Sequence, residues 1–379
     1  MKTLENTNIV LAVTGSIAAV ECVHLAHELR RRGAKVTAVM SEDACGIINP
    51  ASLTYACSTP AITKISGMVE HVLYCGEGGK ADLLLIAPCT ANTIGKIACG
   101  IDDTPVTTFA TTAIGRGMPI VLAPAMHESM YCHPAVAKNL ETLAGFGITV
   151  IPPRMEEEKA KIADIETICM YAERAVSGMP LAGKRVLISS GSCREELDDV
   201  RIVTTRSSGK MGRELALEAF RLGAEVCVVS NTKVHGKIPC VKNIDITSAD
   251  DMHKAVLKEA ADADFYLSAA AISDFAPVRA EGKIQSGKEV FVILSPLEKL
   301  ITKIPEVSKA KIIGFKLGEN SLEEGKKLLK EKNVVMVCAN KPEIMGSSDA
   351  EYILLTGSGK KSVAGTKKEA AQAIWQNLL

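Results

Sequence analysis

The sequence predicts an α/β protein that consists of two tandem Rossmann-like three-layer domains with mainly parallel sheets. The length of 379 residues suits two domains, at roughly 150 residues each. Short apolar runs alternate with helical patterns along the chain, and this alternation is typical of βαβ units. It is interrupted at 177–183, where glycine and proline gather, and then restarts. We therefore expect the domains to span residues 1–178 and 179–379.

The first domain opens with an apolar strand at 8–13 and a helical pattern that ends at Gly33. Further apolar runs predict strands at 35–40, 82–87, 120–123 and 148–151. Helical patterns are found at 92–99, 135–145 and 162–176. The segment 152–161 is highly charged and contains two prolines, so we expect it to be a mobile loop.

The second domain repeats this order of elements. Apolar runs predict strands at 184–189, 225–229, 264–268, 312–315, 334–338 and 352–355. Helical patterns are found at 210–222, 249–260, 321–332 and 367–379. Both domains begin with a strand, a Gly-containing turn and a helix, because Ser190-Gly191-Ser192 stands where the first domain has Thr14-Gly15-Ser16.

Composition excludes several classes of function. The 44 basic residues balance the 44 acidic ones, and aromatic residues make up only 4%, which argues against a nucleic-acid partner. No apolar run reaches the roughly 18 residues that span a bilayer, so we expect no membrane partner. The run at 8–20 is flanked by Glu5 and Glu21 and cut by Thr-Gly-Ser, unlike a signal peptide. The 12 cysteines form no CxxC, which favours reduced thiols in the cytoplasm over structural zinc.

Polar residues follow several predicted strands of the first domain. Gly15-Ser16 follows the first strand, and the loop Thr90–Thr93 follows the strand at 82–87. Carboxyl ends of parallel strands form the edge at which open α/β sheets bind ligands, and helix N-termini there stabilise phosphate. The turn is not GxGxxG, so a mononucleotide remains possible where a dinucleotide does not fit. A plain tight turn with a serine cap is the other interpretation of Gly15-Ser16.

Four segments in order resemble the flavin-containing cysteine decarboxylase family: VTGSIAA, the pair Glu70-His71, APCTANT and PAMHESMY. The resemblance implies a flavodoxin-like fold and a bound FMN that oxidises the substrate thiol, so that CO₂ can leave, and then reduces the product. It implies His71 as the catalytic base and His127 as the contact to the substrate carboxylate. The implied FMN residues are Gly15, Ser16, Ser41, Thr90, Asn92, Thr93 and Thr108, and Ala125 and Met126 are implied in substrate binding.

Two positions depart from this family. His127 stands where the bacterial pattern has Asn, and histidine can still donate a hydrogen bond to a carboxylate. The family's lid carries a cysteine that completes the reduction, but the matching stretch PPRMEEEKAKIA contains none. Either Cys132 or Cys89 substitutes, or the last proton arrives by another route. Metal binding by His127 and His133, or by His24 and His27, is the rival interpretation of these histidines.

The second domain resembles phosphopantothenate–cysteine ligase in the segments SSGKMG, AAAISDF, KIQSG and GFK. The resemblance implies activation of a carboxylate as an acyl-nucleotide, with Mg²⁺ on the nucleotide triphosphate. Lys283 is implied in stabilising charge, and Thr205 stands where the bacterial pattern has Asn. CTP and ATP both remain open as the nucleotide. The implied substrate- and nucleotide-binding residues are Arg201, Ser207, Ser208, Gly209, Lys210, Asp274, Phe315, Asn340 and Lys341.

The order of the two halves resembles the fused enzymes of coenzyme A biosynthesis. It implies a bifunctional enzyme that ligates cysteine to 4′-phosphopantothenate and then decarboxylates the product to 4′-phosphopantetheine. It also implies a homo-oligomer, with trimeric contacts in the decarboxylase half and dimeric contacts in the ligase half, which together would allow a dodecamer. A flavin-binding regulatory subunit and a decarboxylase of peptide cysteines are the alternatives.

Overall fold

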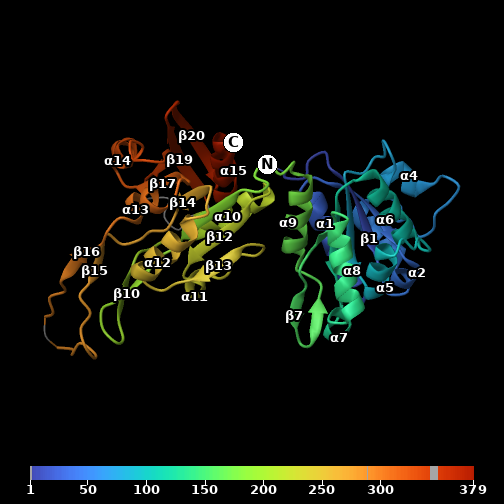
Figure 1. Cartoon of the computed structure of the whole chain (residues 1–379), viewed down its shortest axis with the longest axis horizontal. Coiled ribbons are helices and arrows are strands. Elements are labelled where there is room, and N and C mark those ends of the chain that lie inside the picture. Colours follow the sequence, from blue (N-terminus) through green and yellow to red (C-terminus); the bar gives the residue numbers. More distant parts are fainter. Residues whose placement is uncertain (1, 288, 342–348) are drawn as a thin grey trace. The chain divides into compact units, whose positions relative to one another are not determined.

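The computed structural model describes residues 2–287, 289–341 and 349–379. The chain divides into two compact units, Met1–Gly178 and Met179–Leu379, and each is described by itself (Figure 1). In the described part of the chain, no helix has the length and apolar character needed to cross a bilayer. The predicted fold class, α/β with mainly parallel sheets, is confirmed.

The first unit contains a five-stranded sheet in which all neighbours are parallel. Its order is β2-β1-β3-β4-β6. The strands are β1 (Asn8–Val13), β2 (Lys35–Met40), β3 (Leu83–Cys89), β4 (Ile120–Pro124) and β6 (Thr149–Val150). This is the order of a flavodoxin-like doubly wound sheet, which binds its ligand where the order reverses, between β1 and β3.

Helices cover both faces of this sheet. Alternate residues of β1 point to opposite faces, so that Leu11 joins one buried cluster with α1, α3 and α9 while Val10 joins another with α4, α5, α6 and α8. The result is three layers. The helices are η1 (Ile17–Glu21), α1 (Cys22–Arg31), α2 (Glu42–Cys45), α3 (Pro50–Cys57), α4 (Glu70–Cys75), α5 (Ala91–Ala98), α6 (Pro105–Arg116), α7 (Glu128–Tyr131), α8 (Pro134–Gly145) and α9 (Ile165–Val176).

The segment expected to be a mobile loop is instead a β-hairpin, and that prediction is wrong. β7 (Arg154–Glu156) and β8 (Lys159–Lys161) pair with each other, and β8 also pairs with β5 (Met126–His127). Ala160 in β8 is fully buried, whereas Lys159 is exposed and Lys161 is partly exposed. The strands are too short and too charged to produce an apolar run, so the sequence pattern could not predict them.

The second unit contains an eight-stranded sheet in the order β13-β12-β9-β14-β17-β18-β19-β20. The strands are β9 (Arg185–Ser190), β12 (Glu225–Ser230), β13 (Lys242–Asp245), β14 (Phe265–Ser268), β17 (Lys311–Leu317), β18 (Val334–Asn340), β19 (Asp349–Thr356) and β20 (Gly359–Thr366). From β13 to β18 all neighbours are parallel, and β19 and β20 are antiparallel. The first six strands follow the doubly wound order 3-2-1-4-5-6, with its reversal between β9 and β14.

Helices again lie on both faces, and two ribbons leave the sheet. The helices are α10 (Lys210–Arg221), α11 (Thr232–His235), α12 (Ala249–Ala260), α13 (Leu300–Val307), α14 (Ser321–Leu328) and α15 (Lys367–Leu378). The ribbons pair β10 (Arg194–Glu196) with β11 (Ile202–Thr204), and β15 (Phe275–Pro277) with β16 (Leu294–Pro296). Figure 1 shows β15 and β16 in an arm that extends away from the sheet.

Candidate active sites

A pocket of about 690 Å³ lies at the carboxyl ends of β1 and β3, where the strand order of the first unit reverses. Sequence reasoning singled out many of the residues that line it. These are Gly15, Ser16, Thr90, Asn92, Ala125, Met126 and His127. Segments that are far apart in the sequence therefore meet at one ligand-binding edge.

Hydrogen bonds hold the loops after β1 and β3 together. The hydroxyl of Thr14 donates to the carbonyl of Pro88 at 2.8 Å and accepts from the backbone N–H of Thr90 at 3.1 Å. The Thr90 hydroxyl then caps α5 by accepting from Thr93 N–H at 3.3 Å. Ser16 caps η1 in the same way. The pocket is thus bordered by two helix N-termini, whose partial positive charge favours a phosphate.

Gly15 is required by a close approach of two loops. A Cβ at this position would lie 2.3 Å from the Cβ of Asp43, which also lines the pocket. Real side chains do not reach that distance, so the turn after β1 can pack this closely against α2 only because residue 15 is glycine. The turn lines the pocket directly after a strand and before a helix, a position that suits a phosphate-bearing group such as FMN.

Four other residues expected at the flavin lie outside the lining of this pocket. The buried Ser41 hydroxyl caps α2 by accepting from Ala44 N–H at 3.2 Å. Thr93 lies in the first turn of α5, with its hydroxyl 3.1 Å from that of Thr90. The Thr108 hydroxyl donates to the carbonyl of Thr104 at 2.9 Å within α6.

His71 is the fourth of these residues, and it lies on α4. Its ring contacts Phe109 edge to face, with 6.5 Å between centroids, beside the helix that carries Thr108. Its Nδ1 is buried and has no hydrogen-bond partner among the described residues. The chain by itself therefore does not bring the expected base to the pocket.

The hairpin contributes cations to the pocket in the first unit. Arg154, Lys159 and Lys161 all line it, and Lys159 pairs directly with His127 in the β5–β8 register. Lys161 bonds Glu157 at 2.7 Å, whereas no salt bridge engages Lys159 among the described residues. The pocket therefore presents a histidine and a lysine side by side where the family pattern has an asparagine.

Neither candidate for the role of the absent lid cysteine lines the pocket of its own chain. Cys89 is fully buried in β3, and burial raises the pKa of its thiol far above the ordinary range. Cys132 is exposed at the end of α7 and is not part of the pocket lining. A buried thiol of raised pKa is a poor source of thiolate chemistry.

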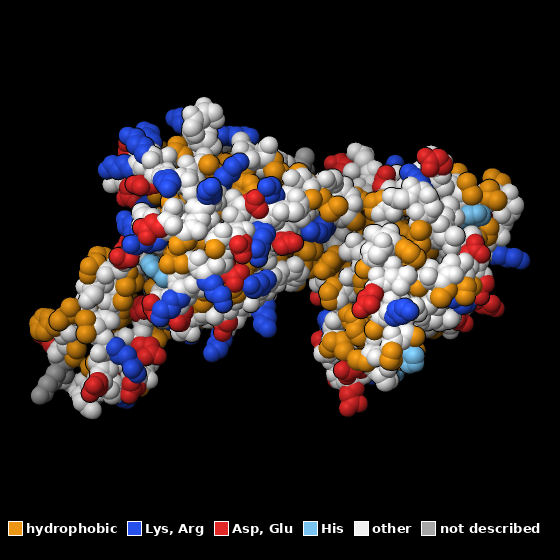
Figure 2. All heavy atoms as spheres, in the orientation of Figure 1, with side chains coloured by type: hydrophobic (Ala, Val, Ile, Leu, Met, Phe, Trp, Pro, Cys, Tyr) orange, Lys and Arg blue, Asp and Glu red, His pale blue; other side chains and the backbone are white. Residues whose placement is uncertain are grey.

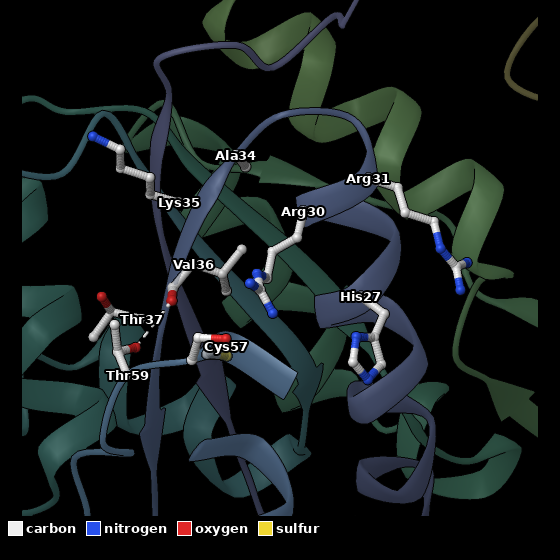
Figure 3. Close-up of a pocket in the computed structure, with 10 residues that line it drawn as sticks. His27, Arg30, Arg31, Ala34, Lys35, Val36, Thr37, Cys57 and Thr59 are labelled. Carbon is white, nitrogen blue, oxygen red and sulfur yellow. Dashed lines mark hydrogen bonds between the residues drawn. The ribbon is translucent and has the colours of Figure 1, made fainter. Parts of the chain in front are cut away.

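A second pocket in this unit, of about 610 Å³, is formed by α1, the start of β2 and the end of α3 (Figure 3). Figure 3 shows Arg30 extending from α1 toward Cys57, with His27 on the same helix.

In the described ranges, no group of three or more His, Cys, Asp or Glu is placed to hold a metal ion.

The second unit has a pocket of about 170 Å³ at the carboxyl ends of β14, β17 and β18 and the start of α10. Six residues singled out from the sequence line it: Ser207, Ser208, Gly209, Lys210, Phe315 and Asn340. Lys316 of the GFK segment also lines it, together with Tyr352 and Lys367, which sequence reasoning missed. The Phe315 ring meets Tyr352 edge to face, with 6.0 Å between centroids.

Glycines and a histidine shape the turns near this pocket. A Cβ on Gly212 would lie 2.1 Å from Ser190 Oγ, and one on Gly191 would lie 2.3 Å from the His235 ring. His235 Nε2 accepts from Ser192 N–H at 3.0 Å, and the ring also bonds the backbone of Ser208. Burial lowers the pKa of His235, so the neutral ring ties the turn after β9 to the turn before α10.

The remaining expected ligase residues lie outside the pocket lining. Arg201 pairs with the buried Asp198 and donates to the carbonyl of Ile284 at 3.2 Å, so it holds the KIQSG loop. Lys283 is exposed on that loop, and Asp274 is exposed before β15. Lys341 is exposed directly after β18.

Thr205 reaches the switch point between β9 and β14. Its hydroxyl donates to the carbonyl of Ala271 at 2.9 Å, and Ala271 lines the pocket. The threonine therefore joins the segment before α10 to the loop after β14, at the position where the bacterial pattern has Asn.

Comparisons with known proteins agree with this two-part organisation. Residues 1–177 match the family described as flavoprotein, and residues 181–379 match the DNA/pantothenate metabolism flavoprotein C-terminal domain. The coenzyme A biosynthesis bifunctional protein CoaBC of Thermococcus kodakarensis is 43% identical, covering 99% of this chain and 95% of that protein. The CoaBC proteins of Methanocaldococcus jannaschii and Vibrio cholerae are 36% and 32% identical, covering 98% and 100% of this chain and 93% and 99% of their own. This chain belongs to the family of bifunctional coenzyme A biosynthesis proteins.

Proposed function

We propose that this chain is a bifunctional enzyme that makes 4′-phosphopantetheine from 4′-phosphopantothenate, cysteine and a nucleotide triphosphate. The observation that carries the proposal is the pair of pockets at the ligand-binding edges of two doubly wound sheets. Each pocket is lined by the motifs that resemble one of the two activities. The 12 free cysteines favour a reducing, cytoplasmic setting.

The first unit would carry the decarboxylase and hold FMN. The turn at Gly15-Ser16 and the N-terminus of α5 at Thr90 both line the pocket and support phosphate binding there. Bound FMN would supply two-electron oxidation of the substrate thiol and the later return of those electrons. The protein's part is to hold the substrate, to remove the thiol proton and to deliver a proton to the product.

The substrate carboxylate would lie against the hairpin. His127 and Lys159 stand opposite each other in the β5–β8 register, and both line the pocket. Each can donate a charge-assisted hydrogen bond to a carboxylate. Arg154 lines the same side and adds positive charge, although it also bonds the carbonyl of Ile162 at 3.1 Å.

A second copy of the chain would complete the decarboxylase site. His71 and Thr108 lie on α4 and α6, outside the pocket lining of their own chain. Exposed apolar residues stand near both places: Ile17 and Val20 at the pocket, and Met68, Val69, Val72 and Leu73 at α4. Two different apolar patches on one chain suit a head-to-tail ring, such as a trimer, in which His71 of one copy serves the pocket of the next.

The second unit would carry the ligase. Ser207 to Lys210, at the start of α10, would hold phosphate, Phe315 would contact the base, and Asn340 would bind at the end of β18. Mg²⁺ would accompany the triphosphate of CTP or ATP. Lys283 and Asp274, exposed at the loop and the arm, would close over the bound nucleotide, and Lys283 would stabilise the charge that develops on the acyl phosphate.

The arm supports a dimer of the second unit. Phe291, Ile293 and Leu294 are 93%, 70% and 50% exposed, and Figure 2 shows hydrophobic side chains gathered along the arm. An apolar ribbon of this kind is expected to be covered in the working protein. Trimeric contacts in one unit and dimeric contacts in the other would together build a dodecamer.

Separate assays of the two half-reactions test this assignment. His71→Asn should abolish decarboxylation of phosphopantothenoylcysteine and leave ligation intact, with His133→Asn as the matched control. Lys283→Ala should block ligation without changing flavin binding, with Lys309→Ala as its control. Decarboxylation that survives in His71→Asn, or ligation that survives in Lys283→Ala, would remove that residue from its role. Flavin binding without either activity would favour a flavin-binding regulatory subunit.

A further inference from the structure

The lysine at the start of the last helix is buried in the pocket of the second unit. Lys367 is 8% exposed and lines the same pocket as Lys210, although 157 positions separate them in the sequence. No hydrogen bond or ion pair joins its ammonium group to another residue in the described part of the chain. A lysine buried to this degree normally has an anionic partner.

The position of Lys367 is fixed from both ends of its helix. At the N-terminus, Thr366 and Glu369 form a capping box, in which the Thr366 N–H donates to Glu369 at 2.9 Å. Near the C-terminus, the fully buried Trp375 donates from Nε1 to the carbonyl of Leu215 in α10 at 3.1 Å. The helices α10 and α15 are therefore held together, and each presents its first residue, Lys210 or Lys367, to the pocket.

The surroundings of Lys367 are positively charged. Burial and the neighbouring charge of Lys210 both lower the pKa of Lys367. Lys316 lines the pocket as well but is paired with Glu324 at 3.5 Å, and no acidic residue belongs to the described lining. The N-cap of α10 is Gly209, in a left-handed conformation, and no side chain caps that helix end. The uncapped N-terminus of α10 and two lysines converge on one small volume, which is the arrangement of an anion site.

We propose that Lys367 is a phosphate-binding residue of this pocket, and that it holds a phosphate group of the substrates together with Lys210 and the N-terminus of α10. The proposal rests on the ligase function proposed above, and it adds a residue from the far end of the chain to that site. A phosphate dianion can accept from both ammonium groups at once, so it would neutralise the two charges that repel each other in the free protein. The nucleotide and 4′-phosphopantothenate both carry this group.

Binding measurements on matched variants test the proposal. CTP, ATP, 4′-phosphopantothenate and inorganic tripolyphosphate are titrated separately into the full-length protein and into Lys367→Met, Lys367→Arg and Lys368→Met. We expect Lys367→Met to weaken at least one of these ligands about 10- to 100-fold, as the loss of a charge-assisted hydrogen bond implies. Lys367→Arg should keep part of the affinity. Lys368→Met, which removes the same charge from the next residue outside the pocket, should bind as the wild type does.

The set of ligands whose affinity falls in Lys367→Met identifies the phosphate group that Lys367 binds. A loss confined to nucleotides and tripolyphosphate assigns Lys367 to the polyphosphate, and a loss confined to 4′-phosphopantothenate assigns it to that ester. Equal binding by wild type and Lys367→Met, equal losses in Lys367→Met and Lys368→Met, or no binding of any of these anions by the wild type would overturn the proposal. If Lys367→Met loses tripolyphosphate binding but the wild type ligates nothing, the phosphate site stands and the ligase assignment fails.

Proton uptake provides a readout that a structural role would not change. The titratable groups facing Lys367 are Lys210, Lys316 and Tyr352 from other elements, and Glu369 on its own helix, which bonds Thr366. An incoming phosphate raises the lowered pKa of Lys367, so binding at alkaline pH, just below the ordinary lysine pKa of about 10.4, should take up protons. Calorimetry in two buffers of different ionisation enthalpy should detect this uptake in the wild type. Uptake of the same size in a folded Lys367→Met protein would contradict the proposal.

Discussion

Substitution of Gly15 by alanine tests whether FMN binding depends on the close contact between the turn after β1 and Asp43 in α2. The new Cβ would lie 2.3 Å from Asp43 Cβ and 3.3 Å from the Asp43 carbonyl carbon. Ordinary carbon contacts are about 3.5–4.0 Å, so the loops after β1 and β2 must separate by more than about 1 Å. Asp43 cannot yield by rotating its side chain, because its Cβ is fixed by the backbone of α2, which Ser41 caps.

Overpacking of this kind lowers the free energy of unfolding by about 1–3 kcal/mol. We therefore expect the first unit to unfold at a temperature lower by several degrees, at about 2–4 °C for each kcal/mol. The affinity for FMN should fall about tenfold or more, which is about 1.4 kcal/mol or more, because the displaced turn lines the pocket and no longer matches the cofactor. Equilibrium dialysis with FMN, read by flavin absorbance, measures the affinity, and calorimetry measures the transition.

Two controls make the test specific to this contact. Gly115→Ala places a Cβ in α6 where no atom lies within 4 Å, so it should keep FMN affinity and stabilise the helix by about 0.5–1 kcal/mol. Asp43→Gly combined with Gly15→Ala removes the clashing atom and should restore much of the affinity. If Gly15→Ala alone binds FMN as tightly as the wild type, the argument from close approach is refuted.

Three further predictions concern other contacts. Gly212→Ala brings a Cβ to 2.1 Å from Ser190 Oγ, so calorimetry should show the second unit destabilised by about 1–3 kcal/mol, and an unchanged transition would contradict this. Because the pKa of His235 is lowered in the folded protein, the neutral ring's contribution to stability is present above its unfolded pKa of about 6.5 and is lost as pH falls through the folded value. Denaturant unfolding between pH 7 and about pH 5 should therefore vary less in His235→Gln than in the wild type; equal slopes would be inconsistent with this. Lys159→Met should raise KM for phosphopantothenoylcysteine about tenfold or more and leave FMN affinity unchanged, and a loss of FMN binding instead would move Lys159 to the cofactor.

The sequence pattern predicted the strongly apolar strands well, because most of their side chains are buried. The strands at 8–13 and 35–40 and the helix at 249–260 coincide with β1, β2 and α12. It missed α6, whose threonine-rich sequence weakens the helical periodicity, although Pro105 after the capping residue Thr104 was a usable signal. It also missed β20, a mostly exposed edge strand with only Val363 buried.

The pocket residues also divide into those that the sequence could predict and those that it could not. Residues on turns directly after parallel strands, such as Ser16 and Thr90, can be placed from the sequence, because the carboxyl edge of a parallel sheet gathers them. Lys367 cannot be placed in this way, because it reaches the pocket only through the packing of α15 on α10. Lys159 could not be placed either, because its charged segment shows no sequence pattern that would predict a strand paired with β5.

The most direct test of the bifunctional assignment is one anaerobic incubation of the FMN-supplemented protein with 4′-phosphopantothenate, cysteine, Mg²⁺ and either CTP or ATP. Mass spectrometry follows the products. We predict 4′-phosphopantetheine with at least one nucleotide, which would also identify the preferred nucleotide. Accumulation of phosphopantothenoylcysteine without phosphopantetheine would contradict the decarboxylase assignment, and the absence of both products despite flavin binding would contradict the account as a whole.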